Sequence, residues 1–379
     1  MFTLLALISL IAWIGLVFFR HSFWTTDQRL PVSDGLLEQW PAVVAIVPAR
    51  NEQETIARCL GAIARQNYAG RLHIVLANDS STDNTADIAT GLGETALSIV
   101  NALPLEEGWA GKMWALEHGV KKAAERAPKF YWFTDADIEH GEGVLSSLVA
   151  HAEANRLGLT SLMVRLRCQN FWEKLLVPAF IYYFCLIYPF RAVNNPKSPI
   201  AGAAGGCILV RKQALEQAGG IVAVKNEVID DCAIGRAVKR AGWPVWLGLA
   251  DDSFSLRGYE KLSDFWNMVK RSAFEQLKHS YLLCAGAIAG LALTFLLPPL
   301  LALGFGLGAW PLAWLAGIAA WILMTASYLP IVRYHKLSPI WALSLPMAAC
   351  LFGAMTVDSA LAGLTGKSAN WRGRDMKNS

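Results

Sequence analysis

The sequence predicts an α/β domain with a mostly parallel β-sheet, flanked on both sides by membrane-spanning segments. Three observations support this fold class. Short apolar runs of strand length alternate with helical patterns between residues 40 and 278. Long apolar runs with almost no charge stand near both ends of the chain. The chain of 379 residues is also 54% hydrophobic, which is more apolar than an ordinary soluble enzyme.

Residues 1–22 are expected to form an N-terminal transmembrane anchor. Phe2 to Phe19 is an uncharged apolar run close to the minimum length for crossing a bilayer. A cleaved signal peptide is the competing interpretation, but no basic region precedes the run and Arg20 to Trp24 is a poor cleavage context. Because Arg20 and Arg29 follow the run, the positive-inside rule places the next domain in the cytoplasm.

Residues 40–278 are expected to form the catalytic domain. Three short apolar runs predict buried strands: Val43 to Val47, His73 to Ala77 and Phe130 to Thr134. The stretches Glu54 to Gln66 and Gly111 to Ala127 have helical patterns. Alternation of strand and helix favours a mostly parallel sheet that is covered on both faces.

Residues 171–190 are an apolar, aromatic-rich run inside this domain. If the run crossed the membrane, Asp135 and Asp137 would lie on the opposite side from Asp231, and they could not share a site. We therefore expect a helix that lies in the membrane interface, where Trp and Tyr are favoured. A buried core helix is the alternative.

Residues 282–365 are expected to hold three further transmembrane segments, at Leu282 to Leu307, Pro311 to Val332 and Ile340 to Leu364. The resulting topology conflicts with the charge rule. With a cytoplasmic catalytic domain, the basic tail of residues 366–379 would emerge outside, where the positive-inside rule disfavours it. Either one segment is re-entrant or a boundary is misplaced, and the sequence leaves both explanations open.

Charge and cysteine content exclude several functional classes. The net charge of +4 is modest and the basic residues form no long run, so nucleic-acid binding is not expected. The seven cysteines are scattered and contain no C-x-x-C pair. This pattern argues against a zinc site and a disulfide framework, and it fits a reducing compartment. The predicted location is a bacterial-type inner membrane, with several crossings and the catalytic domain in the cytoplasm.

Acidic residues stand at three informative places. Asp79 follows the second predicted strand, Asp135 and Asp137 follow the third, and Asp230-Asp231 opens a helix-like stretch. Open α/β sheets bind ligands at their strand ends, and Asp-x-Asp suits a Mg²⁺ or Mn²⁺ ion that holds phosphate oxygens. Helix capping and helix-dipole matching are the plain structural alternatives for Asp79 and for the Asp230-Asp231 pair.

Other residues near these positions suit a nucleotide-linked substrate. Lys112, which follows Gly111, offers a point charge, although a lone surface lysine is the alternative. The sequence contains neither a dinucleotide fingerprint nor a P-loop. The residues that we expect to bind substrate are Pro48, Arg50, Glu52, Asp79, Lys112, Asp135, Gly205 and Gly206.

The order and spacing of these residues resemble the motif series of family 2 glycosyltransferases, over roughly Val43 to Arg271. The resemblance implies a GT-A fold that binds a nucleotide sugar and inverts the anomeric centre. It also implies that Asp79 binds the nucleoside with help from Lys112. Asp137, together with Asp135, would hold the metal and the diphosphate. Asp231, beside Asp230, would be the catalytic base.

Within this family the sequence resembles most the hopanoid-biosynthesis-associated glycosyltransferases. Four segments carry this likeness: Gly108 to Lys112, Ser161 to Arg167, Asn170 to Lys174 and Ile229 to Cys232. The resemblance implies an association with hopanoid synthesis without fixing the acceptor.

Two departures from the family pattern matter. Asn78 stands where the family commonly has a first Asp, so nucleoside contact rests on Asp79 alone. The Q-x-x-R-W element of processive synthases is absent, and Met268 to Ser272 keeps only Arg271, which we assign to substrate contact. The missing tryptophan argues against polymer extrusion.

The predicted function is therefore a membrane-anchored inverting glycosyltransferase that depends on Mg²⁺ or Mn²⁺. It would move one sugar, with a UDP-sugar as the favoured donor, to a lipid hydroxyl such as that of a hopanoid. A processive polysaccharide synthase and a non-enzymatic membrane scaffold with a GT-A fold are the two alternatives.

Overall fold

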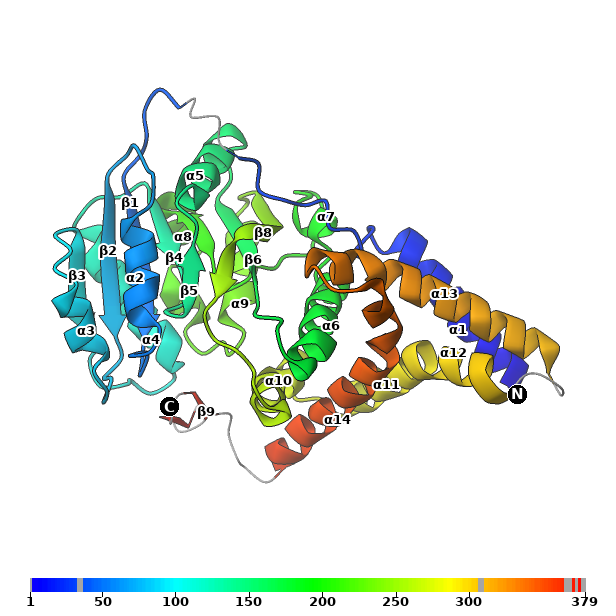
Figure 1. The fold of residues 1–379 in the computed structure, drawn as a ribbon. Helices are drawn as coiled ribbons and strands as arrows, with labels where there is room; N and C mark the ends of the chain where they lie inside the picture. The colour runs from blue at the N-terminus through cyan, green and yellow to red at the C-terminus, as the bar shows by residue number, and fades with distance from the viewer. Residues whose placement is uncertain (1, 33–36, 306–309, 365–369, 372–373, 376–379) are drawn as a thin grey trace. The chain divides into compact units, whose positions relative to one another are not determined.

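The computed structural model describes residues 2–32, 37–305, 310–364, 370–371 and 374–375, so most of the expected basic tail lies outside the described residues. The chain forms two compact units, each built from separate sequence segments (Figure 1). The sheet unit comprises Gln28–Arg167, Ala192–Gly258 and Asn370–Ser379. The helical unit comprises Met1–Asp27, Cys168–Arg191 and Tyr259–Ala369.

The sheet unit contains an eight-stranded sheet of order β3-β2-β1-β4-β7-β6-β8-β5. Strand β1 pairs in parallel with β2 and β4, β2 with β3, and β6 with β8, whereas β7 and β5 run antiparallel to their neighbours. The mostly parallel sheet predicted from the alternating pattern is confirmed. The strands are β1 (Val43–Ala49), β2 (Leu72–Asn78), β3 (Leu97–Asn101), β4 (Phe130–Phe133), β5 (Ile138–His140), β6 (Leu159–Arg165), β7 (Ile208–Arg211) and β8 (Val245–Ser255).

Helices cover both faces of this sheet. They are α2 (Ile56–Ala64), α3 (Thr85–Gly91), α4 (Gly111–Ala124), α5 (Val144–Ala154), α8 (Lys212–Gln217), η1 (Ile221–Val224) and α9 (Asp230–Arg240), while the short α7 (Phe190–Val193) straddles the two units. Alternate residues of β1 point to opposite faces. Ala45 and Val47 pack in the buried cluster that also contains residues of α2 and α5. Ile46 points the other way, and a side chain at Gly119 of α4 would meet its Cγ2 at 2.5 Å.

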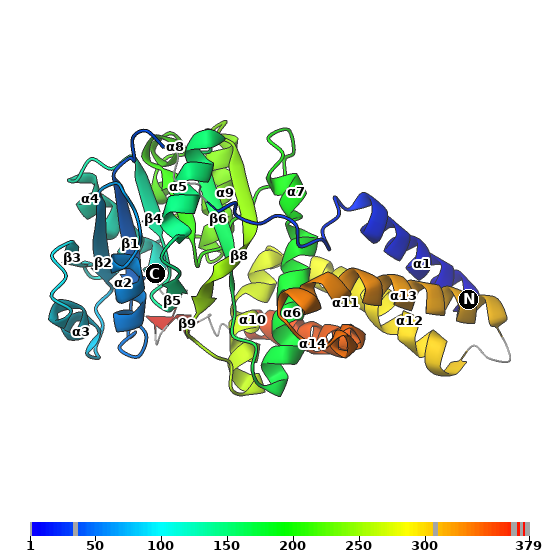
Figure 2. The same cartoon turned by 45° about the horizontal axis from the view of Figure 1, so that its top comes forward.

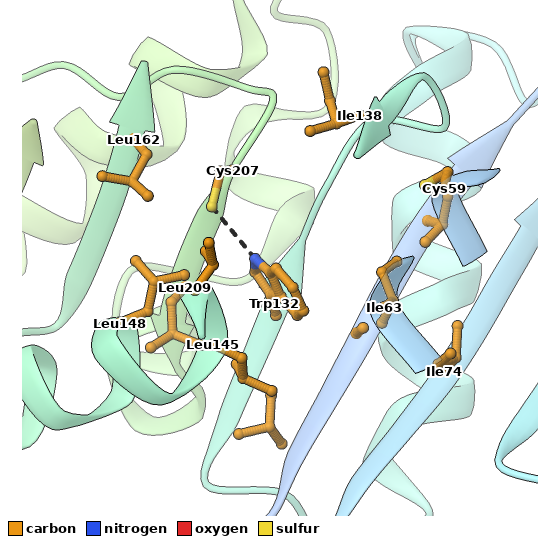
Figure 3. Packing of buried hydrophobic residues seen from close by; sticks show 14 of the residues in the cluster. Cys59, Ile63, Ile74, Trp132, Ile138, Leu145, Leu148, Leu162, Cys207 and Leu209 are labelled. Carbon is orange, nitrogen blue, oxygen red and sulfur yellow. Dashed lines mark hydrogen bonds between the residues drawn. The ribbon is translucent and has the colours of Figure 1, made fainter. Parts of the chain in front are cut away.

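Trp132 of β4 lies at the centre of this cluster (Figure 3). Its side chain is fully buried, and its indole Nε1 donates to Sγ of Cys207 over 3.4 Å. A buried indole N–H needs an acceptor, and the thiol sulfur supplies one. The Trp132–Cys207 contact therefore joins the end of β4 to the segment that leads into β7, and both border the candidate site.

The helical unit is built from helices, several of which are long and apolar. They are α1 (Phe2–Phe19), α6 (Phe171–Ile187), α10 (Leu262–Gln276), α11 (Tyr281–Leu291), η2 (Ala292–Leu296), α12 (Leu297–Leu300), η3 (Leu301–Phe305), α13 (Pro311–Tyr334), η4 (Pro339–Ser344) and α14 (Leu345–Leu364). Among the described residues, five segments are long and apolar enough to cross a membrane: Phe2–Phe19, Phe171–Val193, Tyr281–Gly304, Pro311–Tyr334 and Pro339–Gly363.

Helix α1 packs against α13 and against the segment that precedes α13. Ala6 shares a buried cluster with Ala313 and Ala316 of α13, where small residues let the helix backbones approach closely. Nε1 of Trp13 donates to the carbonyl of Thr294 at 2.7 Å, so the only polar atom of this buried indole side chain is satisfied. These contacts join the first apolar segment of the chain to the later ones.

Helix α6 begins at a complete capping box. Asn170 accepts from the backbone N–H of Glu173, and the Glu173 carboxylate accepts in turn from the backbone N–H of Asn170. Strands β6 and β7, which precede and follow α6, are hydrogen-bonded neighbours in one sheet. If α6 enters a membrane, a single crossing would separate these two strands, so α6 would have to begin and end on the same side. Its location in the membrane interface stays a prediction.

Candidate active site

Strand order explains why distant acidic residues meet. Strand β4 lies between β1 and β7, parallel to the first and antiparallel to the second. The carboxyl end of β4 therefore lies beside the carboxyl end of β1 and the beginning of β7, where Phe133 pairs with Ile208. Asp135 follows β4, and Gly205 precedes β7. A pocket at this place is lined by Pro48, Lys112, Leu116, Phe133, Thr134, Asp135, Gly205, Ile208, Asp230 and Ile234.

The loops after β1 and β2 are hydrogen-bonded to each other. The Asn51 side chain accepts from the backbone N–H of Thr82 at 2.8 Å, and its own backbone N–H donates to Oγ of Ser81. The backbone N–H of Glu52 donates to Oγ1 of Thr85 at 2.8 Å. Asn51 has a φ of 53°, in the left-handed region that asparagine tolerates better than most residues. Together these bonds fix the backbone that carries Arg50, Glu52 and Asp79.

Lys112 bridges two of the acidic positions. Its Nζ lies 2.8 Å from Oδ1 of Asp135 and 3.1 Å from Oδ2 of Asp230. A cation in the first turn of α4 opposes the helix dipole, and burial alone would lower the pKa of this amine. The Asp135 and Asp230 carboxylates outweigh burial and hold the pKa of Lys112 above its usual value. Lys112 therefore stays charged in the site.

Asp231 is held by backbone donors at both carboxylate oxygens. The N–H of Gly205 donates to Oδ2 at 2.8 Å, and the N–H of Cys232 donates to Oδ1 at 2.7 Å. Burial, followed by the adjacent Asp230 carboxylate, raises the pKa of Asp231 to about 6. The group is therefore ionised at neutral pH and is a better proton acceptor than an ordinary aspartate.

Helix α9, which carries Asp231, packs directly on the loop before β7. A side chain at Gly235 would lie 3.0 Å from the backbone carbon of Gly202, so this close contact favours glycine. Sγ of Cys232 donates to the Ala203 carbonyl at 3.4 Å. These contacts explain why Asp231 and Gly205 keep a fixed separation, although 26 positions divide them in the sequence.

The Asp135-x-Asp137 pair fits a divalent cation. Burial, followed by repulsion from Asp135, raises the pKa of Asp137 to about 6, while Arg257 opposes the rise through an Nε–Oδ2 distance of 3.2 Å. Two carboxylates that repel each other in this way would both gain from a shared hard cation. Within the described ranges, no group of three or more His, Cys, Asp or Glu residues has an arrangement that could hold a metal ion, so the metal assignment depends on this pair.

Arg257 joins this acidic pair to the loop after β1. Its NH2 lies 2.7 Å from Oε2 of Glu52, in addition to its contact with Asp137. Burial raises the pKa of Glu52 to about 7, although the Arg257 charge lowers it. One guanidinium thus serves two carboxylates that come from different loops.

A second layer of hydrogen bonds lies behind the acidic residues. His140 is buried, and its Nε2 lies 2.8 Å from Oγ1 of Thr134, while its Nδ1 lies 2.9 Å from Oγ of Ser253. The Thr134 hydroxyl is also 3.0 Å from the Gly206 carbonyl. Burial lowers the pKa of His140 to about 3, so the ring is neutral. This network fixes the backbone on which Asp135 and Gly205 stand.

The predicted site residues divide into three groups. Lys112, Asp135 and Gly205 line the pocket together with Pro48 and Asp230. Asp79 is fully buried; NH1 of Arg50 donates to its carbonyl at 2.7 Å and lies 3.7 Å from its Oδ2. Gly206 packs against Val164, and Arg271 belongs to α10 of the helical unit, so their assignment to substrate contact stays a prediction.

Sequence reasoning missed three residues of this arrangement. Thr134 and His140 flank the Asp-x-Asp segment, and their positions next to it were the available signal. Arg257 lies far along the chain and belongs to no motif that we identified, so its pairing with Glu52 and Asp137 required the structure.

Comparison with known proteins shows which family this chain resembles. Residues 44–219 match the family model described as glycosyl transferase family 2. The chain is also 25% identical, over 231 residues, to the 4,4'-diaponeurosporenoate glycosyltransferase of Staphylococcus aureus strain USA300. That alignment covers 59% of this chain, and the chain spans about 60% of the length of this relative.

One solved structure shares the fold over nearly the whole chain. A mannosyltransferase from Pyrobaculum calidifontis, in complex with GDP-Man and Mn²⁺, has a TM-score of 0.54 at 18% identity, covering 97% of this chain and 100% of that one. Glucosyl-3-phosphoglycerate synthase from Mycobacterium tuberculosis, in complex with UDP, has a TM-score of 0.39 at 17% identity, covering 61% and 77%. Residues 44–219 are therefore similar to glycosyl transferase family 2, and the chain has a GT-A fold.

Proposed function

We propose that the protein is a membrane-anchored, inverting glycosyltransferase that moves one sugar from a nucleotide sugar to a lipid hydroxyl. The observation that carries the proposal is Asp231, whose two carboxylate oxygens are fixed by the N–H groups of Gly205 and Cys232. A carboxylate that is held in this way, with a pKa of about 6, suits a general base. It lies next to Asp230, whose partner Lys112 also contacts Asp135.

The proposed reaction is a direct displacement. Asp231 accepts the proton of the acceptor hydroxyl, and the hydroxyl oxygen attacks the anomeric carbon. The bond from that carbon to the nucleotide diphosphate breaks on the opposite face, so the configuration inverts. The leaving diphosphate keeps the bonding electron pair, and the positively charged Lys112 is placed to stabilise the charge that develops.

Asp135 and Asp137 would hold Mg²⁺ or Mn²⁺. When bound, such an ion neutralises the negative charge on a diphosphate. The repulsion between these two carboxylates, which raises the pKa of Asp137, supports this assignment. Arg257 would then be free to exchange its bond with Asp137 for one with a phosphate oxygen, a ligand that guanidinium groups favour.

The acceptor is proposed to be a lipid because the chain carries several segments with the length and hydropathy of membrane helices. The Staphylococcus aureus relatives are named for transfer to a carotenoid, and the sequence resembles hopanoid-associated enzymes. A hopanoid hydroxyl is our proposed acceptor, and a carotenoid is the alternative that this relative favours. A UDP-sugar is the proposed donor.

A thermal-shift screen tests the donor and metal assignments together. Detergent-purified protein would be heated with UDP, GDP, CDP or their sugars, with and without Mn²⁺. We expect one nucleotide to raise the melting temperature only when metal is present, because a ligand that binds the folded state alone stabilises by mass action. Asp137→Ala should abolish that shift, whereas Asp87→Asn on the exposed face of α3 should keep it. Absence of a shift with every nucleotide would refute the proposal.

A further inference from the structure

We infer that α10 and α14 form a two-helix layer that lies along the membrane surface, and that α14 does not cross the bilayer. The inference rests on the proposed membrane anchoring. The layer contacts the lipid of the bilayer through a stripe of apolar residues on α14. Both helices belong to the helical unit.

Helices α10 and α14 run side by side in the same direction. Near their beginnings, the rings of Phe265 and Phe352 lie 6.0 Å apart. Further along, Oδ2 and Oδ1 of Asp358 accept from Nε1 of Trp266 and Nζ of Lys270, each at 2.8 Å.

The pairing continues to the ends of both helices. Oγ of Ser359 accepts from the backbone N–H of Phe274 at 3.1 Å. A side chain at Gly363 would lie 3.1 Å from the Phe274 ring. Successive residues of α14 therefore meet successive residues of α10, and the two helices share one orientation.

The charge on α14 faces its partner helix. Asp358 is the single Asp, Glu, Lys, Arg or His residue in Pro339–Gly363, and its two carboxylate oxygens are taken by α10 side chains. An unpaired charge in a membrane-spanning helix would be costly. Here the charge instead marks the face of α14 that turns away from lipid.

The exposed faces of the two helices differ sharply in polarity. The exposed residues of α14 recur every three or four positions and are all apolar or weakly polar: Met347, Cys350, Ala354, Val357 and Leu361. Those of α10 are polar: Ser263, Asp264, Asn267 and Arg271. A pair of parallel helices with one apolar stripe and one polar stripe suits a membrane surface, with α14 toward the acyl chains and α10 toward water.

A crossing by α14 is not compatible with this pairing. Helix α10 carries two exposed charged side chains, Asp264 and Arg271, so it is not expected to enter the hydrocarbon core. The second half of α14 is tied to α10, so it has to stay at the same depth. Figure 1 shows α14 turning away from the direction shared by α1 and α13, and in Figure 2 it is strongly foreshortened while those two helices are seen lengthwise.

This arrangement removes the conflict in the predicted topology. Three crossings remain, by Phe2–Phe19, Tyr281–Gly304 and Pro311–Tyr334. The chain then returns after α13 to the side of α10, and it stays there through α14. Arg333 and Lys336 after the third crossing, and the basic residues of the sequence after 366, thus all fall on the cytoplasmic side, as the positive-inside rule requires.

Site-directed spin labelling of the full chain in liposomes tests this inference. In a background without the native cysteines, single cysteines would be placed at positions 347, 350, 354, 357 and 361 and labelled. Power saturation with oxygen and a water-soluble nickel chelate then measures the depth of each label. We expect equal depths along the stripe, near the headgroup boundary. A crossing helix would instead spread positions 347 and 361 over about 21 Å of depth, at about 1.5 Å per residue.

Labels on α13 provide the matched control. Leu312, Leu315 and Ile322 are exposed on this helix, and a label at 322 should lie about 15 Å deeper or shallower than one at 312. A depth gradient on α14 like that on α13 would overturn the surface layer while leaving the anchoring intact. Water accessibility at every α13 label would overturn the anchoring itself.

A C-terminal fusion reports the side of the tail independently of helix depth. Green fluorescent protein fused after Ser379 should fluoresce, and alkaline phosphatase fused there should be inactive, because the tail is expected to stay in the cytoplasm. The opposite pair of results would place the tail outside and refute the inference.

Discussion

Nε of Arg257 lies 3.2 Å from Oδ2 of Asp137, so a fixed cation of the protein occupies one side of the carboxylate that we assign to metal binding. The same guanidinium contacts Glu52, at 2.7 Å. Metal binding and Arg257 therefore compete for Asp137.

Replacing Arg257 by Ala should change the affinity for metal and the affinity for nucleotide in opposite directions. Removal of a positive charge beside Asp137 should tighten Mn²⁺ binding to the free protein by about tenfold, because like charges repel strongly at this distance. The affinity for nucleotide diphosphate should fall, because a guanidinium that favours phosphate is lost. Isothermal titration of Mn²⁺, and of nucleotide at saturating Mn²⁺, measures both. Arg257→Lys, which keeps the charge, should change Mn²⁺ affinity much less. Weaker Mn²⁺ binding in Arg257→Ala would contradict the competition between Arg257 and the metal for Asp137.

Asp231→Asn should lower kcat by about 10²–10⁴-fold, the contribution that is typical of a general base. Donor KM should change little, because Asp231 contacts backbone N–H groups of its own chain rather than the expected diphosphate position. Initial rates at saturating donor and acceptor measure the effect. Asp87→Asn is the matched control, since it makes the same chemical change on an exposed helix face. Near wild-type turnover in Asp231→Asn would remove Asp231 as the base.

Activity should fall on the acid side of about pH 6. A general base works only when it is deprotonated, and the pKa of Asp231 is raised to about 6 by burial and by Asp230. Below that pH, kcat should drop about tenfold per pH unit, and above it kcat should level off. A pH–rate profile at two Mn²⁺ concentrations checks this expectation. More Mn²⁺ would counteract protonation of Asp137. If the acid side of the pH–rate profile moves with Mn²⁺ concentration, the loss of activity therefore comes from the metal site and not from Asp231.

Two neighbouring glycines should respond differently to alanine. A side chain at Gly205 would lie 3.2 Å from Nζ of Lys112 and 3.5 Å from Oδ2 of Asp231, so Gly205→Ala should disturb the site. We expect about a tenfold loss of kcat/KM with an unchanged melting temperature, because small displacements of catalytic groups are costly. A side chain at Gly206 would lie 2.9 Å from Cγ2 of Val164 in the core, so Gly206→Ala should destabilise the fold by about 1–3 kcal/mol. Calorimetry measures the stability of both variants, and initial rates measure their activity. Equal losses of melting temperature in the two variants would contradict the expected difference between Gly205 and Gly206.

Much of the sheet unit could be predicted from hydrophobic periodicity. The strands expected from Val43, His73 and Phe130 are β1, β2 and β4, and each differs from the prediction by at most two residues at either end. Their apolar runs are buried on both faces, which makes the signal strong. The helix expected from Glu54 begins at Ile56 instead, because the preceding residues form turns whose backbone N–H groups bond to the loop after β2.

The candidate site could be predicted only in part. The acidic residues stand at strand and helix ends, which local sequence reveals. The bond between Gly205 and Asp231 depends on how α9 packs on a distant loop, and the bridge from Arg257 to Glu52 joins residues 205 positions apart. Neither contact leaves a local pattern. The same holds for Asp358, whose pairing with α10 changes how Pro339–Gly363 is interpreted.

The helical unit has a consequence for biogenesis, because it is assembled from three separate stretches of the chain. The bond from Trp13 to Thr294 joins residues 281 positions apart, so α1 is synthesised long before its partner exists. Helix α6 emerges between two strands of the sheet, and its apolar surface also has to wait for α10 and α14. Nascent chains with such unpaired surfaces are prone to aggregation. If α1 is the membrane anchor that we propose, production of this protein should depend on early capture of α1 by the membrane-insertion machinery. Truncation before α13 should then leave a polypeptide that is degraded rather than folded.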